Sequence, residues 1–94
     1  MSDKELSDFR LEIDDLDDQL VALLARRMDI VRHVAVYKHH NNIPAVLPER
    51  IEEVCKNVIE AGEMLGLNKA YVKDIWTRII DEACAYEQEF FDEN

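Results

Sequence analysis

Two basic residues interrupt an apolar helical stripe in the first forty residues of this chain. Arg27 follows a cluster of leucines, and Lys38 lies eleven residues later, close to three whole helical turns and so on nearly the same face. Their Cα atoms are then about 16 Å apart along a helix, and two long side chains leaning toward each other can hold one anion with two acidic groups. The alternative is that both side chains extend to solvent at the rim of an interface.

Arg10 is a third cation beside the same stripe, next to Phe9 and near Ile13. It precedes Arg27 by seventeen residues, about 25 Å along a straight helix, so these two cannot share a small ligand within one chain. In an antiparallel pair of long helices, however, Arg10 of one chain approaches Arg27 and Lys38 of the other. Dimerisation and formation of an anion site would then be a single event.

Glu87 is an acidic residue on an otherwise apolar stripe, in register with Trp76, Ile80 and Ala83. A carboxylate on such a face is desolvated, and desolvation favours its neutral form. One interpretation is a salt-bridge partner near a helix end. The other is that Glu87, beside a cationic anion site, donates a hydrogen bond in its protonated form.

No pattern in the sequence indicates a metal ion, a covalent nucleophile or a phosphate-binding glycine loop. The three histidines occur without ExxH or HExxH spacing, and the two cysteines, Cys55 and Cys84, are isolated within apolar helical patterns. We therefore expect no metal and no cofactor, and we expect both thiols to be reduced core residues.

Helices must position these residues, because 94 residues with two Gly and two Pro are typical of a single all-α domain over residues 1–94. The first helix is predicted from Ser2, with a capping box over residues 2–5, to about His40. A short second helix begins near Pro48 and stops near Gly66. A third helix of medium length begins after Asn68, a potential N-cap.

The long first helix also predicts the oligomeric state. Its roughly 38 residues span about 57 Å, whereas a compact chain of this size has a radius of gyration of about 12 Å. The apolar stripe needs a partner along its length, so we expect an intertwined helical homodimer. A net charge of −10 disfavours nucleic acid and anionic membranes. With no leading apolar segment and no apolar run near 18 residues, we expect a cytoplasmic protein with no membrane partner.

The order of these residues resembles the all-helical AroQ class of chorismate mutases. An early Arg, the run Leu-Leu-Ala-Arg-Arg at 23–27, a Lys eleven residues after it and Pro-Glu-Arg at 48–50 carry the resemblance, which covers roughly Leu6 to Gln88. The resemblance implies an intertwined dimer that rearranges chorismate to prephenate in aromatic amino acid biosynthesis. It also implies a dicarboxylate substrate and a pericyclic reaction that needs no cofactor.

The resemblance assigns roles to five charged residues. Arg10 from the partner chain and Arg27 from the same chain bind substrate carboxylates, while Lys38 contacts a carboxylate and the ether oxygen. Arg50 matches the family's Arg at the start of the second helix. Glu87 falls where many members carry Gln and some carry Glu, as the second donor to the ether oxygen. Lys38, Glu87 and Arg27 are the expected catalytic residues.

Three substrate-lining positions depart from the pattern of many bacterial mutases. Leu47 replaces an Asp, Ile51 replaces a Glu that helps to bind the C4 hydroxyl of chorismate, and Ala83 replaces a Ser. Residues 26–29, 43–45 and 48–50 resemble the isochorismate-pyruvate lyase branch of the same fold. Chorismate mutase is expected first. The alternatives are an isochorismate-pyruvate lyase that forms salicylate, a 4-amino-4-deoxychorismate mutase, and a catalytically silent helical dimerisation module.

Overall fold

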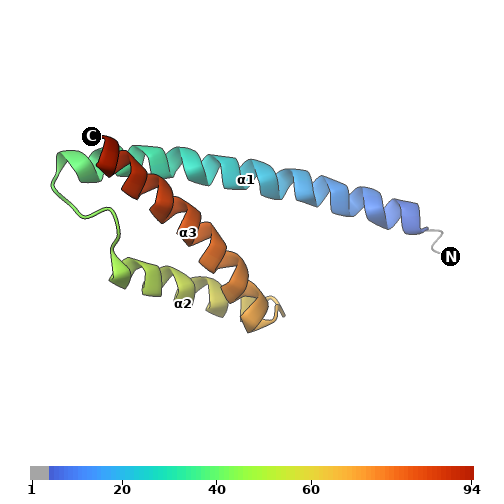
Figure 1. Ribbon diagram of the computed structural model, residues 1–94. Coiled ribbons are helices and arrows are strands. Elements are labelled where there is room, and N and C mark those ends of the chain that lie inside the picture. Colours follow the sequence, from blue (N-terminus) through green and yellow to red (C-terminus); the bar gives the residue numbers. More distant parts are fainter. Residues whose placement is uncertain (1–4) are drawn as a thin grey trace. The chain divides into compact units, whose positions relative to one another are not determined.

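A computed structural model describes residues 5–94, which form three α-helices joined by a loop and a tight turn. The helices are α1 (Leu6–His40), α2 (Pro48–Met64) and α3 (Lys69–Glu93), as Figure 1 shows. The all-α prediction is confirmed, and residues 2–4 of the predicted capping box lie outside the described part. At 25 residues α3 is longer than the medium helix predicted, because no Gly or Pro interrupts it.

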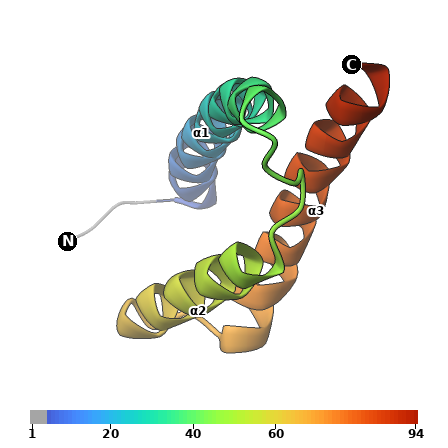
Figure 2. The same cartoon turned by 90° about the vertical axis from the view of Figure 1, so that its left-hand side faces the viewer.

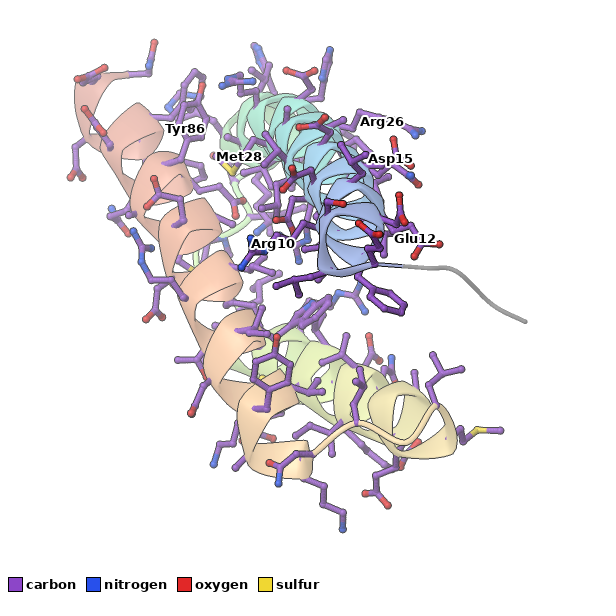
Figure 3. All side chains as sticks on the ribbon, turned by 90° about the vertical axis from the view of Figure 1, so that its right-hand side faces the viewer. Arg10, Glu12, Asp15, Arg26, Met28 and Tyr86 are labelled. Atoms are coloured by element: carbon purple, nitrogen blue, oxygen red, sulfur yellow. The ribbon has the colours of Figure 1, made fainter. Side chains whose placement is uncertain are left out.

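The chain divides into two compact units, one ending at Ile30 and one spanning Val31–Asn94. The first unit contains most of α1, whose apolar residues are exposed. Leu16, Leu20 and Leu23 are 56%, 58% and 54% exposed. Figure 3 shows Glu12, Asp15 and Arg26 on one side of α1, with Arg10 projecting from the other side. The apolar stripe predicted from the sequence is therefore present, and it is open to solvent within one chain.

The second unit combines the last turns of α1 with α2 and α3. Its buried apolar residues come from α1, from α3 and from the loop between α1 and α2: Val31, Ala35, Ala45, Val72, Ile80 and Ala83. Figures 1 and 2 show α2 and α3 meeting at the turn that joins them. Gly62 allows this close approach, because a Cβ there would lie 2.9 Å from Cγ2 of Val72. The single-domain prediction for residues 1–94 stays a prediction.

The helices begin and end at residues whose types typically start or stop helices. Pro48 occupies the first turn of α2, where its missing N–H has no helical partner to lose. Gly66 takes a φ of 81° after α2, and the Asn68 side chain accepts a hydrogen bond from the Tyr71 N–H at 3.0 Å. The turn at Gly66 ends α2 and the cap at Asn68 begins α3, with only residues 65–68 between the two helices. In the described range 5–94, no helix has the length and apolar character needed to cross a bilayer.

Candidate active site

The second unit brings Lys38 and Glu87 together, 49 residues apart in sequence. Lys38 lies in the last turn of α1, and its Nζ is 2.8 Å from Oε1 of Glu87 on α3. The two side chains are 15% and 8% exposed. Lys38 also donates a hydrogen bond to the carbonyl of Ala45, at 3.0 Å. Two of the three predicted catalytic residues therefore form one desolvated ion pair.

Glu87 retains unused hydrogen-bonding capacity inside this pair. The residue is 6% exposed, and its Oε1 forms no hydrogen bond with any of residues 5–94. The ammonium of Lys38 lies 2.8 Å from that oxygen and forms an ion pair with it. Buried polar atoms without a hydrogen bond are uncommon. Oε1 can therefore accept from a ligand donor or, when protonated, donate to a ligand oxygen.

Contacts on either side of the ion pair hold the last turns of α1 against α3. The guanidinium carbon of Arg32 lies 5.8 Å from the centroid of the Tyr86 ring, a residue labelled in Figure 3. The His39 ring packs edge-on against Phe90 and Phe91, with centroids 5.9 and 5.3 Å apart. These supports were not predicted from the sequence, in which the available signal is that His39 adjoins Lys38 and Tyr86 adjoins Glu87.

Cys84 reports on the electrostatics of the pair, since it lies three residues before Glu87 on α3. Burial raises the pKa of the Cys84 thiol, and the negative charges of Glu87 and Asp81 raise it further. The positive charge of Lys38 opposes them by lowering that pKa. The thiol is therefore held in its neutral form, which is not the reactive form of a cysteine.

The residues expected to surround the substrate lie around the start of α2 and on α3. Leu47 is the N-cap of α2 and, with Arg50, lines an open hollow of about 550 Å³. Arg50 forms an exposed ion pair with Glu53. Ile51 is half-buried and Ala83 is buried. The hollow is lined by Leu47, Pro48, Glu49 and Arg50, so it combines one cationic and one acidic side chain with two apolar ones.

Arg10 and Arg27 belong to the first unit. Arg10 is exposed and Arg27 is half-buried. Their convergence with Lys38 on one ligand stays a prediction, as do the roles assigned to all the site residues. In the described chain, His, Cys, Asp and Glu form no cluster of three that could hold a metal ion.

The sequence of this chain matches a known protein family and several characterised proteins. The family model described as chorismate mutase type II matches residues 9–88. The T-protein of Haemophilus influenzae is 36% identical over 85 residues, which are 90% of this chain and 22% of that protein. A 4-amino-4-deoxychorismate mutase of Streptomyces venezuelae is 30% identical over 83 residues, or 88% of this chain and 81% of that protein.

A bifunctional chorismate mutase/prephenate dehydratase of Buchnera aphidicola is 35% identical over 75 residues, 80% of this chain and 20% of that protein. The chain thus spans about a fifth of the length of the T-protein and of the bifunctional enzyme that it matches. None of these relatives supports the resemblance to the lyase branch. The match confirms the expected AroQ class: the chain belongs to the type II chorismate mutase family.

Proposed function

We propose that this chain catalyses the rearrangement of chorismate to prephenate, an intramolecular isomerisation within aromatic amino acid biosynthesis. The observation that carries the proposal is the buried Lys38–Glu87 pair, in which Oε1 forms no hydrogen bond, in a chain of this family. In the reaction one C–O ether bond breaks and one C–C bond forms, and no group leaves the molecule. The chain must therefore fold a flexible dianion into its reactive shape and stabilise the negative charge that develops on the ether oxygen.

Lys38 and Glu87 are suited to the second of these tasks. An N–H of Lys38 donates to the ether oxygen, and protonated Glu87 donates from the other side. Fixed donors in a cavity with little water stabilise developing charge strongly, and the loss of one typically costs about 10²–10³-fold in rate. Glu87→Gln keeps a hydrogen-bond donor at this position and is expected to stay active, whereas Glu87→Leu is expected to lose about 10²–10³-fold in rate. Equal rates in the two variants would remove Glu87 from this role.

Cationic clamps perform the first task. Arg27 and Arg50 from one chain, with Arg10 from its partner, bind the two carboxylates of the substrate and hold it in the compact conformation. Orientation of this kind is a major source of rate enhancement. An Arg guanidinium binds a carboxylate through two parallel hydrogen bonds, so substitution by Lys loses both geometry and affinity.

The shared use of Arg10 requires a homodimer, and the exposed stripe of α1 supports one. Several leucines of this stripe are more than half exposed in a single chain. Each Å² of their apolar surface that a second copy covers stabilises the dimer by about 25 cal/mol. Arg10→Ala and Arg27→Ala dimers are both expected to be nearly inactive. After mixing and refolding, random pairing restores one intact site in half of the dimers, or about a quarter of the wild-type activity. No recovery on mixing would argue against a site shared between chains.

A relative matched over most of its length gives a second candidate substrate, 4-amino-4-deoxychorismate. Leu47 and Ile51 offer no side-chain acceptor or donor to a C4 hydroxyl, and the Streptomyces venezuelae relative matched over 81% of its length is named as a mutase of the amino analogue. Product identification after incubation with chorismate, the amino analogue and isochorismate separates these functions. Prephenate from chorismate supports the first proposal, and turnover of the amino analogue alone supports the second.

Salicylate and pyruvate formed from isochorismate would instead support the lyase alternative. The absence of turnover with all three substrates would contradict the enzymatic proposals and leave the helical dimerisation module.

A further inference from the structure

Oxygen atoms from two different elements surround the ammonium of Lys38. Nζ donates to the Ala45 carbonyl at 3.0 Å and lies 2.8 Å from Oε1 of Glu87. Ala45 follows Lys38 by seven residues, in the loop between α1 and α2, and it is buried. An ammonium has three N–H donors. The loop and α3 therefore fix the nitrogen from two sides and leave donor capacity for a ligand oxygen.

The Ala45 carbonyl reaches this nitrogen because the chain reverses sharply after α1. Asn42 has a φ of 56°, and the next residue, Ile43, donates its N–H to the Lys38 carbonyl at 2.9 Å. A left-handed residue followed by a hydrogen bond back across the last turn is a common way to end a helix. The loop after α1 therefore contacts Lys38 twice. Its Ile43 N–H donates to the Lys38 carbonyl, and its Ala45 carbonyl accepts from the Lys38 ammonium.

The turn after α2 shows what the backbone requires at such a position. There Gly66 has a φ of 81°, and Leu67 donates its N–H to the Gly62 carbonyl at 2.9 Å. Glycine adopts positive φ without a steric cost, and Asn tolerates it better than most residues. Asn42 is the only non-glycine residue among 5–94 with positive φ. A residue with a less tolerant side chain would strain the turn that carries Ala45.

We propose that Asn42 is a positioning residue: its left-handed backbone places the Ala45 carbonyl against Nζ and so fixes the Lys38 ammonium beside Glu87. The effect of this placement on catalysis rests on the proposed function, whereas the placement itself does not. The side chain of Asn42 is not required to touch the substrate, because it acts through the loop.

The rate at which acetic anhydride acetylates Lys38 in the full chain tests the placement. Mass spectrometry follows each lysine separately, and the exposed Lys56 and Lys73 serve as internal references. Asn42→Gly keeps the left-handed turn and is expected to label like the wild type. Asn42→Ala and, more strongly, Asn42→Val disfavour the turn. The strain typical of a left-handed L-residue shifts such an equilibrium by about 5- to 30-fold, and we expect a rise of that order in Lys38 labelling for Asn42→Val.

Gly66→Ala is the matched control, because it strains the equivalent turn after α2. It is expected to leave Lys38 labelling unchanged. Unchanged labelling of Lys38 in both Asn42→Ala and Asn42→Val would overturn the proposal. An equal rise of Lys38 labelling in Gly66→Ala would also overturn it, as would an equal rise of labelling at Lys56 and Lys73. Either result would mean that the fold loosens as a whole.

A kinetic readout separates this inference from the proposed function. If the wild type converts chorismate, Asn42→Val is expected to lower kcat more than it raises KM, with Asn42→Gly close to wild type. A wild type without turnover would refute the proposed function, and the labelling series would still decide the placement of Lys38. Turnover with unchanged labelling across the series would overturn the positioning role alone.

Discussion

Substitution of Lys38 by Met tests how the buried ion pair contributes to stability. Met keeps the unbranched apolar stem of the side chain and removes the ammonium. Because the two side chains are only 15% and 8% exposed, the carboxylate of Glu87 then stays buried without its cation. Removal of one partner from a buried pair typically costs 3–5 kcal/mol, so we expect the free energy of unfolding to fall by about 3–5 kcal/mol.

The double variant Lys38→Met/Glu87→Leu distinguishes this cause from a simple loss of packing. Apolar residues of similar volume often replace a buried ion pair without loss, or with a gain of about 1–4 kcal/mol. We therefore expect the double variant to recover most of the stability that Lys38→Met loses, although it lacks both proposed donors. Such recovery is a large coupling energy between the two positions.

Urea unfolding followed by circular dichroism at one fixed protein concentration measures these changes, since association of chains would otherwise shift the midpoint. Arg78→Met is the matched control, because it breaks the exposed Arg78–Glu82 pair, whose side chains are 72% and 58% exposed. That change is expected to cost less than about 1 kcal/mol. A cost of Lys38→Met no greater than that of Arg78→Met, or additive destabilisation by the two substitutions in the double variant, would show that the buried pair is not energetically coupled.

Three further outcomes follow from the second unit. Gly62→Ala places a Cβ 2.9 Å from Cγ2 of the stiff Val72 side chain. We expect the free energy of unfolding to fall by about 1–3 kcal/mol, which is visible as a lower Tm. An unchanged Tm would show that α2 and α3 move apart at no cost. Asn68→Ala removes the cap on α3 and is expected to cost about 1 kcal/mol in urea unfolding, whereas no loss would mean that water replaces it. The raised pKa of Cys84 means that the folded chain binds the thiol proton more tightly, so stability falls as pH rises above the ordinary thiol range. Cys84→Ala should flatten that fall, and an identical pH dependence in the variant would contradict the assignment.

Local chemistry explains why the helices could be predicted from sequence. Uninterrupted apolar repeats predicted α1, and Pro48, Gly66 and Asn68 each act in the structure as their residue types suggest. The length of α3 was underestimated, because only the absence of a stop signal indicated how far it continues.

The candidate site could be predicted only in part. A carboxylate and an ammonium on apolar stripes stand out in sequence, and the structure brings Lys38 and Glu87 to 2.8 Å. The hydrogen bond from Lys38 to Ala45 could not be foreseen, because it depends on the left-handed conformation of Asn42. The edge-on packing of His39 was also hidden, since it joins residues about fifty positions apart.

The rate of prephenate formation from chorismate, measured on the wild type and on Lys38→Met, is the most direct test of catalysis by Lys38. We expect catalytic formation of prephenate by the wild type and a loss of at least about 10²–10³-fold in kcat for the variant, under conditions where circular dichroism shows it folded. No prephenate from the wild type would refute the mutase activity, and equal rates from a folded Lys38→Met would refute the catalytic role of Lys38.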